Sequence, residues 1–240
     1  MTAREVIEKG LELDGTESAS FQFRLKPGLS HAQIQDLEER LNATLPSEVR
    51  ELLAFTSGFY SRPIGNVNFS AKEMFEFPDI LPLGLPLAAD ECGNNWVVDI
   101  KRSTGEWGAV FFLSHDPPVV VIQAPDLVRF ISQIFDYGDS EPNGRLNYVR
   151  EMAASKIWRE DPYLLDIGAS RVSADPNLAE FSRQLSDAFR IADLRSLEVG
   201  SGFAWGRNGP NSKIRRYGSE LLFGVETKKS LLGTLLKRKS

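Results

Sequence analysis

The chain has 240 residues, of which 42% are apolar and 25% charged, the balance of a globular protein that can bury its own hydrophobic core. Its single cysteine, Cys92, excludes an internal disulfide and a zinc site built from several cysteines, and it is typical of a reducing compartment. The N-terminus has no apolar signal core, and no apolar run reaches the roughly 20 residues of a membrane span. We therefore expect a cytoplasmic protein without a transmembrane segment.

Charge is unevenly distributed along the chain, whose formal net charge is −5. From residue 213 to 240 eight Lys and Arg stand against two Glu, whereas the rest has 20 Lys and Arg against 31 acidic residues. An acidic main body argues against nucleic-acid binding there and leaves a basic partner open. The basic tail at 228–240, with leucines between its cations, is a candidate for contact with an acidic surface; the alternative is a solvated helix end.

The first 60 residues predict three short helices. Residues 1–25 favour an amphipathic helix followed by an extended segment. A capping box between Ser30 and Gln33 opens the second helix, which has apolar residues at spacings of three and four. The third helix follows Leu45-Pro46, with Ser47 as the expected N-cap and Gly58 as the stop.

The middle of the chain predicts antiparallel strands. Residues 96–100, 107–113 and 119–122 are rich in β-branched and aromatic residues and are separated by short polar turns, which is typical of a meander. Residues 80–83 are apolar but contain a proline, so we expect a strand end or a docked loop there. Asp126 then caps a helix that ends near Gly138.

Residues 139–144 are the best candidate for a domain boundary. Beyond them we expect a helix over 146–158, a helix from Asp175 whose apolar stripe continues to Ala192, and a β-hairpin over 214–225. The glycine-rich stretch 200–206 lacks the Lys-Ser/Thr ending of a phosphate-binding loop, so we interpret it as a loop leading into a strand. The prediction is an α+β fold with a domain at 1–138 and a C-terminal helical and hairpin extension at 139–240 packed on it.

Three segments together resemble the SUKH superfamily. Residues 45–53 (LPSEVRELL), closing at 57–59 (SGF), are similar to its "LP…L" helix, although Ser57 stands where asparagine is usual. Residues 93–99 (GNNWVVD), with 110–112 and His115-Asp116 after them, are similar to its second signature, and the helix at 127–135 to its closing helix. The resemblance covers about residues 25–138, and the nearest branch is the Smi/Knr type of fungal cell-wall assembly regulators and bacterial immunity proteins.

This resemblance implies a mostly antiparallel sheet partly wrapped by helices and no enzyme activity; we also expect no cofactor. It also implies a cleft offered to another protein, in bacteria often a toxin that the family member neutralises.

The segment 90–96 carries the most informative polar cluster, with two carboxylates, two amides and an indole beside a glycine. Such groups suit recognition of a basic or polar protein surface, with Trp96 as an aromatic anchor. The alternative is that Gly93-Asn94 only makes a turn and that Trp96 lies in the core. Our candidate partner-binding residues are Asp90, Glu91, Asn94, Asn95, Trp96, Asp99, His115 and Asp116.

Catalytic and metal-binding interpretations of these residues are weaker. Asp90 and Glu91 are adjacent, so on an extended chain they point to opposite faces and do not flank one bond. The spacing from Asp90 fails an EF-hand loop, because its third, sixth and twelfth positions are Cys92, Asn95 and Lys101. A nucleophilic pair of Cys92 and His115 lacks an evident third, orienting group. We therefore predict no metal and no catalytic residue.

The resulting hypothesis is a protein-binding module, either an immunity or a regulatory protein, that binds a basic partner in an acidic cleft. A small-molecule or peptide sensor using the same cleft is the second hypothesis, and an enzyme that uses Cys92 or the carboxylates is the third.

Overall fold

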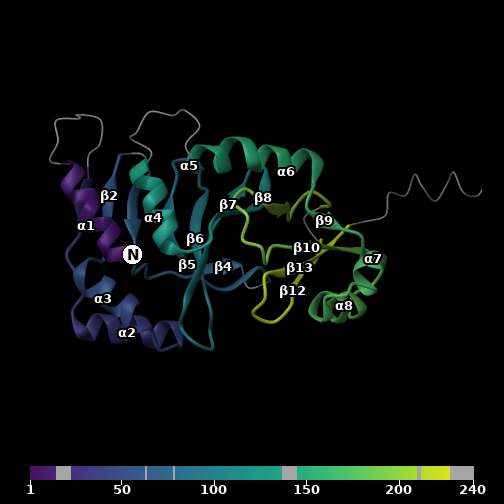
Figure 1. The fold of residues 1–240 in the computed structure, drawn as a ribbon, viewed down its shortest axis with the longest axis horizontal. Coiled ribbons are helices and arrows are strands. Elements are labelled where there is room, and N and C mark those ends of the chain that lie inside the picture. Colours follow the sequence, from purple (N-terminus) through teal and green to yellow (C-terminus); the bar gives the residue numbers. More distant parts are fainter. Residues whose placement is uncertain (15–22, 63, 78, 137–144, 210–211, 228–240) are drawn as a thin grey trace, which may run out of the picture.

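A computed structural model describes the chain except for residues 15–22, 63, 78, 137–144, 210–211 and 228–240. It confirms the α+β class, with helices arranged around three antiparallel sheets (Figure 1). The predicted boundary at 139–144 and the basic tail lie outside the described residues.

A six-stranded antiparallel sheet is the centre of the molecule. Its strands follow the order β11-β8-β7-β6-β5-β4. They are β4 (Phe75–Phe77), β5 (Leu81–Ala89), β6 (Asn95–Ile100), β7 (Trp107–His115), β8 (Pro118–Ala124) and β11 (Gly202–Ala204). The predicted meander is confirmed, because β6 pairs with β7 and β7 with β8. The proline-containing segment at 80–83 holds the start of a nine-residue strand, β5, in agreement with the strand end expected there. A register shift lies further along this strand, between Pro86 and Ala88.

Both faces of this sheet are covered. Along β7, Val110 and Phe112 face one hydrophobic core while Phe111 and Leu113 face another, as the two-residue period of a strand requires. Strands that are apolar at every position are buried on both sides. Each face therefore needs its own covering layer.

The N-terminal half covers the first face. Its helices are α1 (Ala3–Asp14), α2 (His31–Leu41), α3 (Ser47–Phe55) and α4 (Leu127–Phe135), and a small sheet is formed by β1 (Phe23–Leu25), β2 (Gly58–Ser61) and β3 (Gly65–Asn68). The capping box of α2 and the Asp126 cap of α4 are both present. Ser47 is not the cap of α3, because Pro46 takes that position and no side chain caps the helix.

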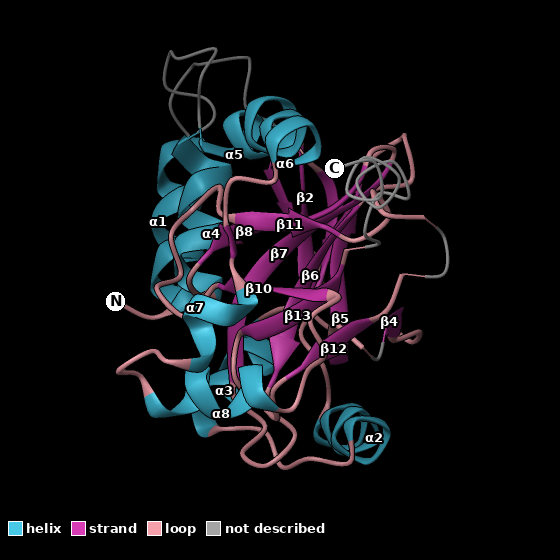
Figure 2. Ribbon diagram, turned by 90° about the vertical axis from the view of Figure 1, so that its right-hand side faces the viewer, coloured by secondary structure: helices cyan, strands magenta, loops and turns pink. Residues whose placement is uncertain are grey.

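The C-terminal part extends both layers. A continuous helical stretch adds to the first core and lies along β8 and β11 (Figure 2). It comprises α5 (Arg145–Asn147), the π-helical segment η2 (Tyr148–Ala153) and α6 (Ala154–Glu160). Strand β11 pairs with β8, so a segment about 80 residues downstream completes the sheet of the first half. The described elements from α5 to β11 thus pack on the first half of the chain.

The second face is covered by a four-stranded sheet of order β12-β13-β10-β9. Its strands are β9 (Leu164–Leu165), β10 (Phe189–Asp193), β12 (Ile214–Arg216) and β13 (Leu222–Glu226), and the predicted hairpin at 214–225 is confirmed as β12 and β13. Helices α7 (Ile167–Arg171) and α8 (Pro176–Arg183) close its outer side and enclose a third small core.

The predicted continuation of a helix to Ala192 is wrong. Helix α8 ends at Arg183, and Phe189–Asp193 form strand β10 between β9 and β13. Leu185 and Ala188 continue the helical spacing, but Phe189 and Ile191 also alternate as a strand does. Pairing on both sides of β10 favours the strand, which the local pattern alone leaves ambiguous.

Candidate functional site

Two turns at one end of the central sheet bring the predicted site residues together. The β5–β6 turn and the β7–β8 turn lie at the same end because successive hairpins of a meander alternate ends. The Asn94 Oδ1 accepts a hydrogen bond from the backbone N–H of His115 at 3.3 Å. A Cβ on Gly93 would lie 3.4 Å from the His115 ring. We call this surface, residues 90–95 with His115 and Asp116, the turn pair.

Asp90 and Asn94 are occupied in building the first turn. The Asp90 carboxylate accepts from the backbone N–H groups of Cys92 and Asn94 at 2.9 and 2.8 Å and from the Asn94 side-chain amide at 2.8 Å. Gly93 has a φ of +83°, a conformation that favours glycine. These two polar side chains therefore fix the shape of the turn, and only part of Asp90 stays open to solvent.

Trp96 is a core residue and not an exposed anchor. Its side chain is 1% exposed and packs against Phe112 with ring centroids 5.2 Å apart. The indole N–H donates to the Gln123 Oε1 at 3.0 Å, and the Gln123 amide donates in turn to Gln133 at 2.7 Å. The alternative interpretation of Trp96, a packed residue with a satisfied N–H, is the one that the structure shows.

Asp99 is likewise turned inward. Its carboxylate forms a two-bond ion pair with Arg216, at 2.9 and 2.6 Å, and the two side chains are only 9% and 6% exposed. The pair joins β6 to β12, which are more than 100 residues apart in the sequence. Asp99 therefore connects the two stacked sheets and is not placed to contact a partner.

The remaining predicted residues stay accessible, and two of them are acidic. Glu91, His115 and Asp116 are exposed, Asn95 is half-buried, and Cys92 is exposed beside them. The turn pair thus presents the carboxylates of Glu91 and Asp116 together with part of Asp90. In the described part of the chain no cluster of three His, Cys, Asp or Glu residues is arranged as a metal site.

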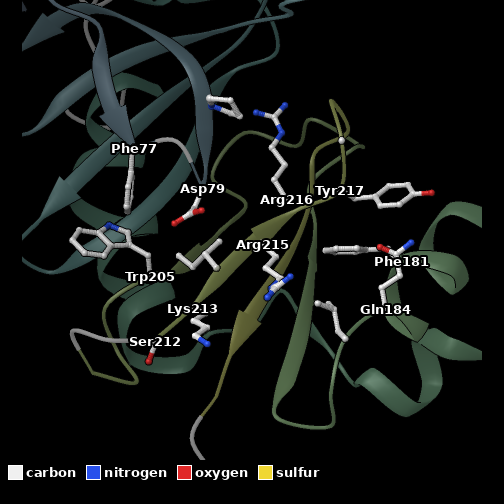
Figure 3. Close-up of a pocket in the computed structure, with 14 residues that line it drawn as sticks. Phe77, Asp79, Phe181, Gln184, Trp205, Ser212, Lys213, Arg215, Arg216 and Tyr217 are labelled. Carbon is white, nitrogen blue, oxygen red and sulfur yellow. The ribbon is translucent and has the colours of Figure 1, made fainter.

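A cavity of about 880 Å³ lies elsewhere, between the edge of the central sheet and the C-terminal hairpin (Figure 3). Lys213, Arg215 and Arg216 line it, against the single carboxylate of Asp79. It is therefore not the acidic cleft that the sequence led us to expect. Sequence reasoning identified the hairpin but missed the cavity, whose one local signal is the pair of cations on either side of Ile214.

Another charged cluster is structural. Asp175 caps α8 by accepting from the backbone N–H of Leu178, and its carboxylate also accepts from Arg195 at 2.6 Å. The Arg195 guanidinium, followed by the N–H groups of the helix start, lowers the pKa of Asp175. Arg195 also bonds Asp193, so this cluster ties α8 to the end of β10.

Residues 28–133 match the SMI1 / KNR4 family (SUKH-1). The matched range begins just before α2 and ends within α4, so it includes the turn pair and excludes every element from α5 onward. No curated protein is matched by the chain. None of the helices in the described residues is long and apolar enough to cross a membrane.

Proposed function

We propose that the protein, whose residues 28–133 match the SMI1 / KNR4 family (SUKH-1), is a non-enzymatic protein-binding module of the immunity or regulatory kind. The family match is the observation that carries the proposal. The strand side chains of this domain are buried in two hydrophobic cores, which leaves its polar turns for recognition. Binding residues concentrate on loops that a rigid scaffold holds in place.

The contact surface that we propose is the turn pair. It stands on a rigid base, because Asp90 and Asn94 hold the first turn and Asn94 ties it to the second. Its exposed carboxylates, Glu91 and Asp116, favour a partner with a basic surface. Binding would act by occlusion, with the acidic surface covering a basic functional surface and charge attraction raising the association rate.

The immunity and regulatory roles make different predictions. An immunity protein is encoded beside a larger toxin, and its co-expression restores the growth of cells that make this toxin. A regulatory protein has a partner whose production alone does not stop growth. The first experiment is therefore to co-express the protein with the product of the adjoining gene and to measure growth and direct binding.

Charge reversal on the turn pair tests the surface. We expect Glu91→Lys with Asp116→Lys to lower the association rate for the partner by about tenfold or more at low salt, and less at high salt. Glu51→Lys with Glu160→Lys is the matched control, because both glutamates are exposed on other elements and the change in net charge is the same. Unchanged binding by the turn-pair variant would place the interface elsewhere. A growth defect that co-expression of the unmodified protein does not relieve would argue against immunity.

A further inference from the structure

Strand β12 is the edge of the four-stranded sheet, and among the residues that the structure describes no strand pairs with its other side. The Lys213 carbonyl accepts from the Glu226 N–H at 2.9 Å, and the Tyr217 N–H donates to the Leu222 carbonyl at 3.0 Å. Residues 213 and 217 therefore turn their main-chain groups toward β13, and residue 215 between them does the same. Because bonding direction alternates along an antiparallel strand, the N–H and C=O groups of Ile214 and Arg216 face the open side. An open edge of this kind is a template for another strand.

The 880 Å³ cavity follows this edge. All seven residues from 212 to 218 line it. Figure 3 shows Phe77, Asp79 and Trp205 on one side of β12, and Phe181, Gln184 and Tyr217 on the other. Phe77 and Trp205 pack edge to face with ring centroids 5.1 Å apart, and Phe181 and Tyr217 pack as tilted rings with centroids 5.2 Å apart. The open edge thus lies at the bottom of a groove between two aromatic walls.

The side chains of β12 alternate between these walls. Ile214 belongs to the core on the side of Phe77 and Trp205, while Lys213 and Arg215 are exposed. Neither of these two cations forms an ion pair within the part of the chain that the structure describes. The charge of Arg216 is already matched by Asp99, so Lys213 and Arg215 are the charges that the groove offers to a ligand, with Asp79 on the facing wall.

We propose that this groove binds an extended acidic segment of a partner protein, which adds to β12 as a further strand. Main-chain bonds to Ile214 and Arg216 hold the segment, and its side chains meet those of β12 residue by residue. Residues opposite Lys213 and Arg215 are two apart and share a face, so we expect acidic residues there. The residue between them faces the side of Ile214, Phe77 and Trp205 and is apolar.

The site lies outside the turn pair, and apart from Phe77, Asp79 and Pro82 its lining lies outside the matched domain. It therefore goes beyond the proposed function and is independent of it. The protein would hold one partner surface at the acidic turns and an acidic strand at the basic groove.

The test uses the full chain and a capped peptide that alternates glutamate and valine between flanking glycines. Titration followed by backbone amide NMR is expected to shift the signals of residues 212–218. A peptide with lysine in place of glutamate is expected to bind at least tenfold more weakly. A third peptide carries N-methyl groups on the alternate amides that would face β12, so it cannot donate hydrogen bonds to this strand. Its binding is expected to be lost although its charge is unchanged.

Protein variants complete the test. We expect the variant Lys213→Glu with Arg215→Glu to lose its binding of the glutamate peptide and to bind the lysine peptide instead. Arg129→Glu with Lys156→Glu is the control, since both residues are exposed on α4 and α6 and the charge change is the same. Equal binding of the N-methylated peptide, or shifts confined to residues outside 212–218, would overturn the proposal. So would self-association through β12 in the absence of peptide, which would identify a second copy of the chain as the occupant.

Discussion

The ion pair of Asp99 and Arg216 is the contact whose removal we expect to harm the fold most. Arg216 also donates to three backbone carbonyls: those of Ile80 at 3.1 Å, Ser219 at 3.0 Å and Glu220 at 2.9 Å. Asp99→Ala would leave the guanidinium buried without its counter-charge. Breaking one side of a buried pair costs about 3–5 kcal/mol of unfolding free energy.

That cost is measurable by thermal and urea unfolding. A chain of this size loses about 2–4 °C of Tm per kcal/mol, so we expect Asp99→Ala to lower Tm by roughly 6–20 °C. High salt is expected to change this difference little, because buried charges are screened weakly. The exposed pair of Arg4 and Glu8, 50% and 43% accessible, is the control: Glu8→Ala should cost about 0.5 kcal/mol or less.

A double-mutant cycle decides whether the pair acts as a unit. Asp99→Leu with Arg216→Met replaces both charges by apolar groups, and we expect it to be more stable than the sum of the single losses predicts, by about 1–3 kcal/mol. Additive losses, or a cost of Asp99→Ala no larger than that of the surface control, would refute the inference that this pair is buried and coupled between the two sheets.

Four further predictions follow from single contacts. Burial raises the pKa of Asp161, so the protonated carboxyl stabilises the fold below its ordinary pKa of 3.8, and this stabilisation is lost as pH rises through the folded pKa. Asp161→Asn should therefore raise Tm at pH 7, and the gain should vanish in acid. Trp96→Phe, which leaves the buried Gln123 Oε1 without its donor, should cost about 2–4 kcal/mol in urea unfolding, without changing the partner affinity of the folded protein. A Cβ at Gly202 would lie 2.0 Å from a carbonyl oxygen of β8, so Gly202→Ala should cost about 1–3 kcal/mol in the same assay by disturbing the β11 pairing. Residues 1–138 alone would expose the second apolar face of the central sheet, so we expect this fragment to aggregate or to bind a hydrophobic dye strongly.

The sequence predicted the α+β class, the meander and the family resemblance because these depend on local and periodic signals. Turn residues separate apolar runs at 96–100, 107–113 and 119–122, and the capping box of Ser30 and Gln33 is readable from their spacing of three residues. The continuous apolar run of β7 is a further sequence signal, because a strand that is apolar at every position needs cover on both faces. The structure shows that described residues after 138, such as Ala192, Phe203 and Phe223, supply the second cover.

The fate of single side chains was decided only by tertiary structure. No sequence feature near Asp99 identifies Arg216 as its partner, because the pairing depends on how two sheets stack. The sequence around Trp96 is the same whether the residue is an exposed anchor or a core residue. Its hydrogen bond to Gln123, two strands away in the sheet, is what identifies it as a core residue. The groove along β12 exists because two sheet edges and α8 meet there, and contacts between distant segments leave no periodic trace in the sequence.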